Sequence, residues 1–284
     1  MSLSTVLFLF LAHLGVGIVV SLALVSRHAG VKFFRFNAGL ASILLIIALV
    51  FAYNSVPNLA SLGQSTVEGP GGISAVSTGF DLLLLVLATA AIVVYWATVG
   101  RMLANVRPVI LGVSIVAGLT AIVMQALSLS ALRALPMQAL TVASFLSSAA
   151  LLGFACTAMI LGHWYLVIPS MQVSYLQSIV KVHIVSMIVR VVVVGAAVFL
   201  AIVTWQPGLG PSFKHYIVSA AGIFFWQRVL FGLVGPAILS YLTWETAKIQ
   251  STQSATGILY VDFFTVVVGE VLAKYLLLAT RVPV

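Results

Sequence analysis

Residues 3–25 read LSTVLFLFLAHLGVGIVVSLALV, a continuous apolar run in which His13 is the only ionisable side chain. A helix needs about 20 apolar residues to cross a hydrocarbon core about 30 Å thick. The apolar residues follow one another instead of alternating, which favours a helix over a strand of a membrane barrel. No basic segment precedes the run and no clear cleavage site follows it, so we interpret it as a retained transmembrane helix.

Seven further runs of similar length predict the rest of the fold. They cover residues 37–56, 78–102, 108–132, 140–161, 173–204, 216–244 and 255–279. Together with the first run they predict an all-α fold, a polytopic transmembrane bundle of about eight helices. Residues 1–284 are expected to form a single integral membrane domain.

The composition supports a chain that is surrounded mainly by membrane lipid. Of 284 residues, 62% are hydrophobic and 6% are charged, and the mean hydropathy is +1.23. A soluble domain needs far more surface charge. The net charge of +8 does not indicate nucleic-acid binding, because the cations are dispersed between apolar runs. The single cysteine, Cys156, excludes an intramolecular disulfide or a thiolate metal cluster within this chain, and no metal site is expected.

The loop cations predict the orientation of the bundle. Most of them follow odd-numbered helices, namely Arg27, Lys32, Arg35, Arg101, Arg107 and Lys248. The opposite side holds Arg133, Lys214 and Arg281. By the positive-inside rule the first group is cytoplasmic, which places both termini on the extracytoplasmic side.

Five charged residues inside the apolar runs are candidates for a proton path: Asp81, Arg190, Arg228, Asp262 and Glu270. An ionisable group in hydrocarbon costs several kcal/mol unless it is paired or faces water. Arg228 and Glu270 both fall near the middle of the bilayer and are natural partners, and Arg190 with Asp262 is a second possible pair. The alternative is that these pairs only hold the last three helices together.

His13 lies about halfway along the first run, and Gly15 and Gly17 follow it. These small residues let another group approach the helix closely. A neutral imidazole there could hydrogen-bond a quinone carbonyl and exchange its proton. His13 and Gly17 are therefore candidate quinone-binding residues, although His13 could equally be a satisfied packing residue.

Two other histidines could hold a b-type haem. His163 ends the fifth run and His183 begins the apolar part of the sixth, on the same predicted side of the membrane. A haem between helices needs two axial histidines at matching depth, which this pair could supply. Each also has an ordinary explanation as an interfacial or hydrogen-bonded side chain.

The layout resembles the membrane anchors of bacterial molybdopterin and iron-sulfur oxidoreductases, the NrfD, polysulfide reductase and DMSO reductase anchor group. The resemblance rests on eight helices in under 300 residues, on His13 followed by Leu14-Gly15-Val16-Gly17, and on Gly269-Glu270 in the last helix. It implies a quinol site beside iron-sulfur or cytochrome subunits, in the bacterial inner (plasma) membrane. It also implies that Asp81, Arg228 and Glu270 belong to a proton path.

The preferred hypothesis is a quinone-binding or quinone-reactive membrane subunit of a respiratory oxidoreductase complex, with possible proton transfer. The alternatives are a b-type membrane cytochrome, a secondary transporter and a purely structural subunit. Gly232, Gly235 and Pro236 could interrupt the seventh helix, as transporters often require. No motif of a soluble enzyme is present.

Overall fold

The computed structural model describes residues 3–55, 73–101, 104–131, 133–167, 172–204 and 212–284. Within these ranges the regular structure is helical and no strand occurs. Eight helical stretches are long and apolar enough to cross a membrane, which confirms the predicted polytopic helical fold. Each apolar run satisfies its backbone hydrogen bonds within its own helix, as the interior of a bilayer requires.

The helices follow the predicted order with small differences at their ends. They are α1 (Leu3–Leu24), α2 (Val31–Ser55), α3 (Ile73–Thr98), α4 (Arg107–Ser130), α5 (Leu135–Val167), α6 (Val173–Val203), α7 (Phe213–Val218), α8 (Ile223–Val229), α9 (Gly235–Lys248) and α10 (Thr252–Thr280). The largest difference is in α5, which extends beyond residues 140–161 at both ends. Its outer turns are less apolar, so hydropathy alone placed them outside the helix.

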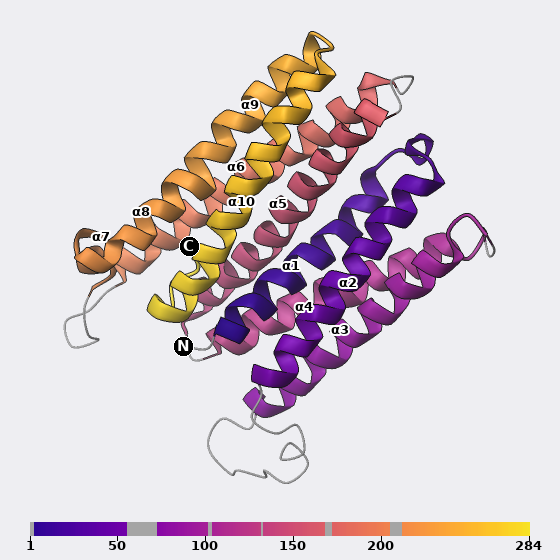
Figure 1. The fold of residues 1–284 in the computed structure, drawn as a ribbon. Helices are drawn as coiled ribbons and strands as arrows, with labels where there is room; N and C mark the ends of the chain where they lie inside the picture. Colours follow the sequence, from indigo (N-terminus) through magenta and orange to yellow (C-terminus); the bar gives the residue numbers. More distant parts are fainter. Residues whose placement is uncertain (1–2, 56–72, 102–103, 132, 168–171, 205–211) are drawn as a thin grey trace.

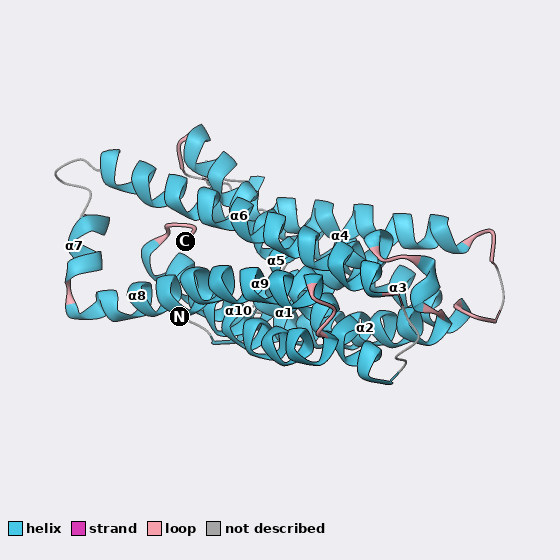
Figure 2. Cartoon of the chain, turned by 90° about the horizontal axis from the view of Figure 1, so that it is seen from above, coloured by secondary structure: helices cyan, strands magenta, loops and turns pink. Residues whose placement is uncertain are grey.

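The seventh span is not one regular helix. Between α7 and α9 the chain forms a 3₁₀ turn at Ala220–Gly222, then α8, then a π-helical segment at Leu230–Val234. Pro236 stands in the first turn of α9, where it has no amide hydrogen to donate back into the preceding turn. Figure 2 shows α7 turned away from the line of α8. At Gly232, Gly235 and Pro236, where the sequence predicted a possible interruption, the span changes from α-helical to π-helical geometry but stays helical.

Two helices form the centre of the bundle. In their most apolar windows, 78% of residues of α1 and 83% of residues of α5 are buried, against 28% for α6. Helices α2, α3 and α4 lie on one side of this central pair, and α6 to α10 lie on the other (Figure 1). Polar side chains within these windows, such as His13 of α1 and Ser148 of α5, therefore face protein instead of lipid. Both marked chain ends lie toward the same end of the bundle (Figure 1).

Glycine lets the two central helices approach each other closely. A Cβ built on Gly17 would overlap the backbone of Ala149 in α5, and one built on Gly153 would overlap the backbone of Gly17. Small residues at a helix crossing allow this kind of backbone contact in membranes. Gly17, which we predicted to contact a quinone, has the backbone of α5 beside it.

Candidate functional site: a buried charge cluster between α1, α5, α6, α8 and α10

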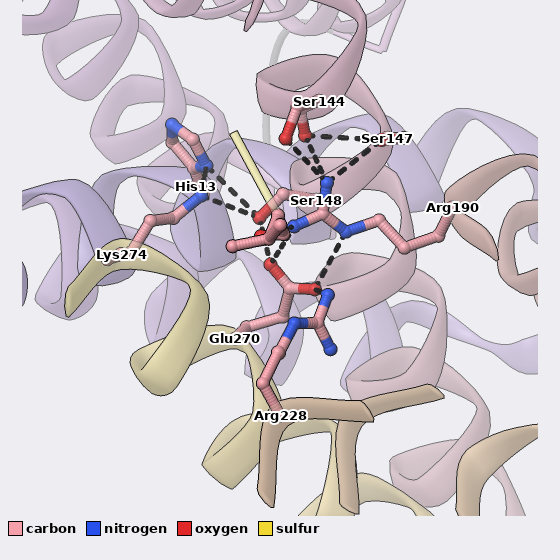
Figure 3. A network of polar contacts seen from close by, with 9 residues as sticks. His13, Ser144, Ser147, Ser148, Arg190, Arg228, Glu270 and Lys274 are labelled. Atoms are coloured by element: carbon pink, nitrogen blue, oxygen red, sulfur yellow. Dashed lines mark hydrogen bonds and ion pairs between the residues drawn. The ribbon is translucent and has the colours of Figure 1, made fainter. Parts of the chain in front are cut away.

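Glu270 of α10 forms the centre of a fully buried cluster of charged residues (Figure 3). Its Oε1 accepts hydrogen bonds from Nε of Arg190 at 2.9 Å and from Nη2 of Arg228 at 2.8 Å. Nη2 of Arg190 also donates to Oε2 at 3.1 Å. The predicted pair of Arg228 and Glu270 is confirmed, and Arg190 joins it as a second guanidinium partner. We call these residues, with the serines, Lys274 and His13 described next, the Glu270 cluster.

Three serines of α5 supply the neutral polar groups of the cluster. Nη1 of Arg190 donates to Oγ of Ser144 at 2.7 Å and to the carbonyl oxygen of the same residue at 3.0 Å. It also lies 3.4 Å from Oγ of Ser147. Ser148 donates to Oε2 of Glu270 at 2.5 Å. Residues 144, 147 and 148 share one face of α5 because helical neighbours recur every three to four positions.

Lys274 and His13 complete the network on the side of α1. Nζ of Lys274 lies 2.7 Å from Nδ1 of His13 and 2.8 Å from Oγ of Ser148. Oγ of Ser148 also lies 3.3 Å from Nδ1 of His13. A continuous chain of hydrogen bonds therefore connects His13, through Lys274 and Ser148, to the carboxylate of Glu270 (Figure 3).

The contact with Lys274 determines which nitrogen of His13 carries hydrogen in the neutral ring. An ammonium group only donates, so Nδ1 of His13 accepts and the hydrogen of the neutral imidazole is on Nε2. Nε2 is buried and has no hydrogen-bond partner among the described residues. The ring of Phe145 packs edge-on against His13, with the ring centroids 4.7 Å apart. His13 thus presents a buried, unused donor at the edge of the cluster.

The cluster contains more positive than negative groups. Arg190 and Arg228 contact the carboxylate of Glu270, and Lys274 is linked to it through Ser148. Nη2 of Arg190 also donates to the main-chain oxygen of Val284 at 3.4 Å. Nε and Nη1 of Arg228 are buried without a described partner. Buried charges are costly unless they are paired and fully hydrogen-bonded. The unused donors of Arg228 and His13 give the cluster the capacity to bind an additional acceptor.

The π-helical segment brings the backbone of the seventh span close to α10 at the level of the cluster. A Cβ on Gly232 would overlap Nη1 of Arg228 and the Cα of Gly269. A Cβ on Gly269 would in turn overlap the Cα of Gly232. Gly269, the residue before Glu270, therefore allows the seventh span to approach α10 closely enough for Arg228 to contact the carboxylate of Glu270. Single-turn π segments occur frequently at functional sites.

Asp262 does not pair with Arg190, so that prediction was wrong. Oδ2 of Asp262 lies 2.7 Å from Nε2 of His183, and both side chains are fully buried. His183 and Asp262 each lie ten residues after the first residue of their helix, whereas Arg190 is 17 residues into α6 and Glu270 is 18 into α10. Since α6 and α10 run in the same direction, partners lie at matching depths. The two pairs stack along one interface, about two helical turns apart.

The remaining predicted site residues lie away from the Glu270 cluster. Asp81 is buried on α3, which packs mainly on α2 and α4, and its Oδ1 accepts the amide hydrogen of Leu82 at 2.8 Å. His163 is exposed, and its Nδ1 lies 2.8 Å from the hydroxyl of Tyr260. His183 is engaged with Asp262. The two histidines considered as haem ligands therefore differ in exposure and have separate partners on α10.

Comparison with known proteins finds no match. No family model fits the chain, and no curated protein or solved structure is significantly similar to it. The relationship to the NrfD-type anchors therefore stays a prediction. Any functional assignment has to be argued from the geometry of the site.

Sequence reasoning missed Lys274 and the serines of α5. Lys274 lies four residues after Glu270, a spacing that puts both on one helix face and favours their interaction. Its position near the end of an apolar run carries no distinct signal, because a lysine there can also extend to the membrane surface. The serines at 144, 147 and 148 repeat at helical spacing inside an apolar run, which is a weak signal for a polar face.

Proposed function

We propose that this protein is a membrane subunit of a redox complex in which the Glu270 cluster exchanges a proton with a membrane quinone. The observation that carries the proposal is the buried Nε2 donor of His13, which is connected to Glu270 through Lys274 and Ser148. A quinone supplies two carbonyl oxygens that accept hydrogen bonds and take up protons upon reduction. His13 matches that chemistry with a donor at hydrocarbon depth.

The hydrogen-bonded chain behind His13 supports proton exchange. When His13 gives the hydrogen of Nε2 to a quinone oxygen, Nδ1 can take a proton from the ammonium group of Lys274, which is left as a neutral amine; the reverse transfers accompany proton release by a quinol. Ser148 holds Lys274 beside Glu270, because it accepts a hydrogen bond from Nζ and donates one to Oε2. Arg190 and Arg228 hold the carboxylate in place from two other helices. Groups that are held in position in a dry interior can exchange protons without reorganising water. Electrostatic preorganisation is most effective in such a water-excluded site.

The His183–Asp262 pair supports a proton route between the Glu270 cluster and one end of the bundle. It lies on the same interface of α6 and α10 as Arg190 and Glu270. Nδ1 of His183 and Oδ1 of Asp262 are buried with no described partner, so each keeps one unused hydrogen-bonding site. Nearer the start of α10, Tyr260 contacts the exposed His163. In this proposal electrons pass between the quinone and cofactors on an iron-sulfur or cytochrome partner, and the complex lies in a bacterial inner membrane.

Binding of short-tail quinones to the purified protein tests the proposal. We expect one short-tail ubiquinone or menaquinone to bind in detergent, measured by equilibrium dialysis. His13→Gln should weaken binding about fivefold or more, the value of one hydrogen bond. His215→Gln is the matched control, because His215 is exposed on α7. Failure of the wild type to bind either quinone, or wild-type affinity of His13→Gln, would overturn the assignment.

A second candidate, a secondary transporter, is favoured by one observation. The seventh span changes to π-helical geometry at Leu230, two residues after Arg228, and transporters use irregular helices to build substrate sites near the middle of the bilayer. The unused donors of Arg228 would then bind an anionic substrate. Uptake of small carboxylates by proteoliposomes, lost in Arg228→Gln and without quinone binding, would favour this function over the first.

A further inference from the structure

A cavity of about 450 Å³ lies at the end of the bundle opposite the marked chain ends, away from the Glu270 cluster. The end of α1, the start of α2, the end of α3 and the start of α4 enclose it. Its volume falls in the range of about 300–1,000 Å³ that is usual for small-molecule sites. Neither the proton route nor the proposed quinone contact uses this cavity.

The lining of the cavity has an apolar body and a cationic part. Leu22, Phe34 and Leu111 are among the apolar side chains, whereas Arg27 and Arg107 supply positive charge. Among the described residues that line the cavity there is no aspartate or glutamate. The combination fits a ligand with an anionic head and a hydrocarbon portion.

The surface around the cavity is positively charged, like the cationic part of its lining. Lys32, Arg35 and Arg101 lie on the same segments as the lining residues, at the start of α2 and after α3. Arg35 stacks over the ring of Trp96, with its guanidinium carbon 5.7 Å from the ring centroid. Basic clefts between transmembrane helices are a recurrent form of anionic lipid recognition. An aromatic ring beside a cation is typical of the interface region where lipid head groups lie.

We propose that this cavity binds an anionic amphiphile, with its phosphate or carboxylate head at Arg27 and Arg107 and its apolar portion against Phe34 and Leu111. Tyr95, which is buried and lines the same space, can donate its hydroxyl hydrogen to the head group. Acidic phospholipids and free fatty acids share this chemistry. The proposal does not depend on quinone binding, since its residues are separate from the Glu270 cluster.

Gly112 provides a direct way to fill the cavity. It lines the space, and a Cβ built on it would meet no atom within 4 Å. The Cβ of a leucine at this position therefore enters open space, and the rest of its side chain is expected to occupy ligand volume. Gly195 on α6 is the matched control, because a Cβ there also meets nothing within 4 Å and the residue is exposed far from the cavity.

Native mass spectrometry of the delipidated full-length protein tests the proposal with four probes: phosphatidylglycerol, palmitate, phosphatidylcholine and inorganic phosphate. We expect phosphatidylglycerol or palmitate to bind at least about tenfold more tightly than phosphatidylcholine, and whichever binds identifies the source of the head group. Gly112→Leu should lose this binding and Gly195→Leu should keep it. Arg27→Gln with Arg107→Gln should weaken it about fivefold for each charge removed, whereas the double lysine variant should retain most of it.

Three results would overturn the proposal. They are equal binding of phosphatidylcholine, unchanged binding by Gly112→Leu, and binding of inorganic phosphate as tight as that of the lipids. The thermal unfolding temperature of each variant is measured in the same detergent to identify variants that do not fold. If Gly112→Leu does not fold, the arginine variants test the proposal instead. Unchanged lipid binding by Arg27→Gln with Arg107→Gln would then overturn it.

Discussion

Gly17 and Gly153 face each other where α1 crosses α5, so closely that a methyl group on either would overlap the backbone of the other helix. The crossing sets the distance between the two central helices and, with it, the distance between His13 and Ser148. Both residues of that second pair lie about one turn before a glycine of the crossing. The packing of glycines and the geometry of the polar cluster are therefore linked.

Substitution at this crossing should lower stability. Gly153→Val forces α1 and α5 apart, and overpacking of this kind costs about 1–3 kcal/mol. Thermal unfolding can be followed through Cys156, the single cysteine, which is buried and becomes reactive toward a maleimide dye when the protein unfolds. We expect a decrease of several degrees for Gly153→Val. Gly257→Val is the control, since a Cβ there meets nothing within 4 Å, and an equal decrease in both would contradict the prediction.

Removing the carboxylate of Glu270 should be far more damaging than removing an exposed one. Glu270→Gln leaves the charges of Arg190 and Arg228 buried without a counter-ion, and breaking a buried pair typically costs about 3–5 kcal/mol. The control is Glu245→Gln, because Glu245 pairs with Lys248 at 2.7 Å but the two side chains are 43% and 49% exposed. Exposed pairs contribute about 0–1 kcal/mol. Similar unfolding temperatures for the two variants would refute the central role of Glu270.

Asp262 should tolerate an amide better than an apolar side chain. Asp262→Asn keeps a hydrogen-bonding group beside Nε2 of His183, whereas Asp262→Leu leaves that nitrogen buried and unpaired at a cost of about 1–3 kcal/mol. We expect the unfolding temperature to decrease in the order wild type, Asn variant, Leu variant. In Asp262→Leu, a further change of His183 to Phe should restore part of the loss, because both polar groups are then absent. An additive decrease in the double variant would argue against their coupling.

Replacing Phe145 should change access to His13. Its ring packs against the imidazole and also lies below Nζ of Lys274, which is 5.0 Å from the ring centroid. Phe145→Leu removes the edge-on contact while keeping an apolar side chain, so short-tail quinones should associate faster. Stopped-flow measurement of quinone binding checks this. Unchanged association in Phe145→Leu, alongside weaker binding in His13→Gln, would place the route to His13 elsewhere.

The orientation of the bundle can be measured with two variants, each of which carries one introduced surface cysteine. Ile249, at the turn between α9 and α10, is 76% exposed, and Leu135, at the start of α5, is 80% exposed. The distribution of loop cations predicts that Ile249→Cys is labelled by an impermeant maleimide from the cytoplasmic side and Leu135→Cys from the other side. Wild-type Cys156 is buried and provides the unlabelled background. Reversed labelling would mean that both termini are cytoplasmic.

The sequence was sufficient for the fold and for part of the site. Continuous apolar runs specify helices because lipid leaves the backbone no other partner, and depth counting placed Arg228 beside Glu270 correctly. It failed for Arg190, which was expected nearer the surface. Arg190 is in fact 17 residues into the 31-residue helix α6, near its middle and at nearly the same depth as Glu270 in α10. Helix rotation, which determines which of several polar residues meet, depends on packing between distant segments and cannot be derived from depth alone.

The order in which the charges are synthesised follows from their positions on the helices. Arg190 enters the bilayer with α6 and Arg228 with α8, before the ribosome has made α10, which carries Glu270. Each arginine at the centre of a membrane costs at least about 2.5–3.5 kcal/mol until it is paired. During biogenesis the nascent bundle therefore holds two arginines without their counter-ion, and insertion of α10 supplies it. Synthesis of α10 and consolidation of the membrane fold are thus coupled through one carboxylate.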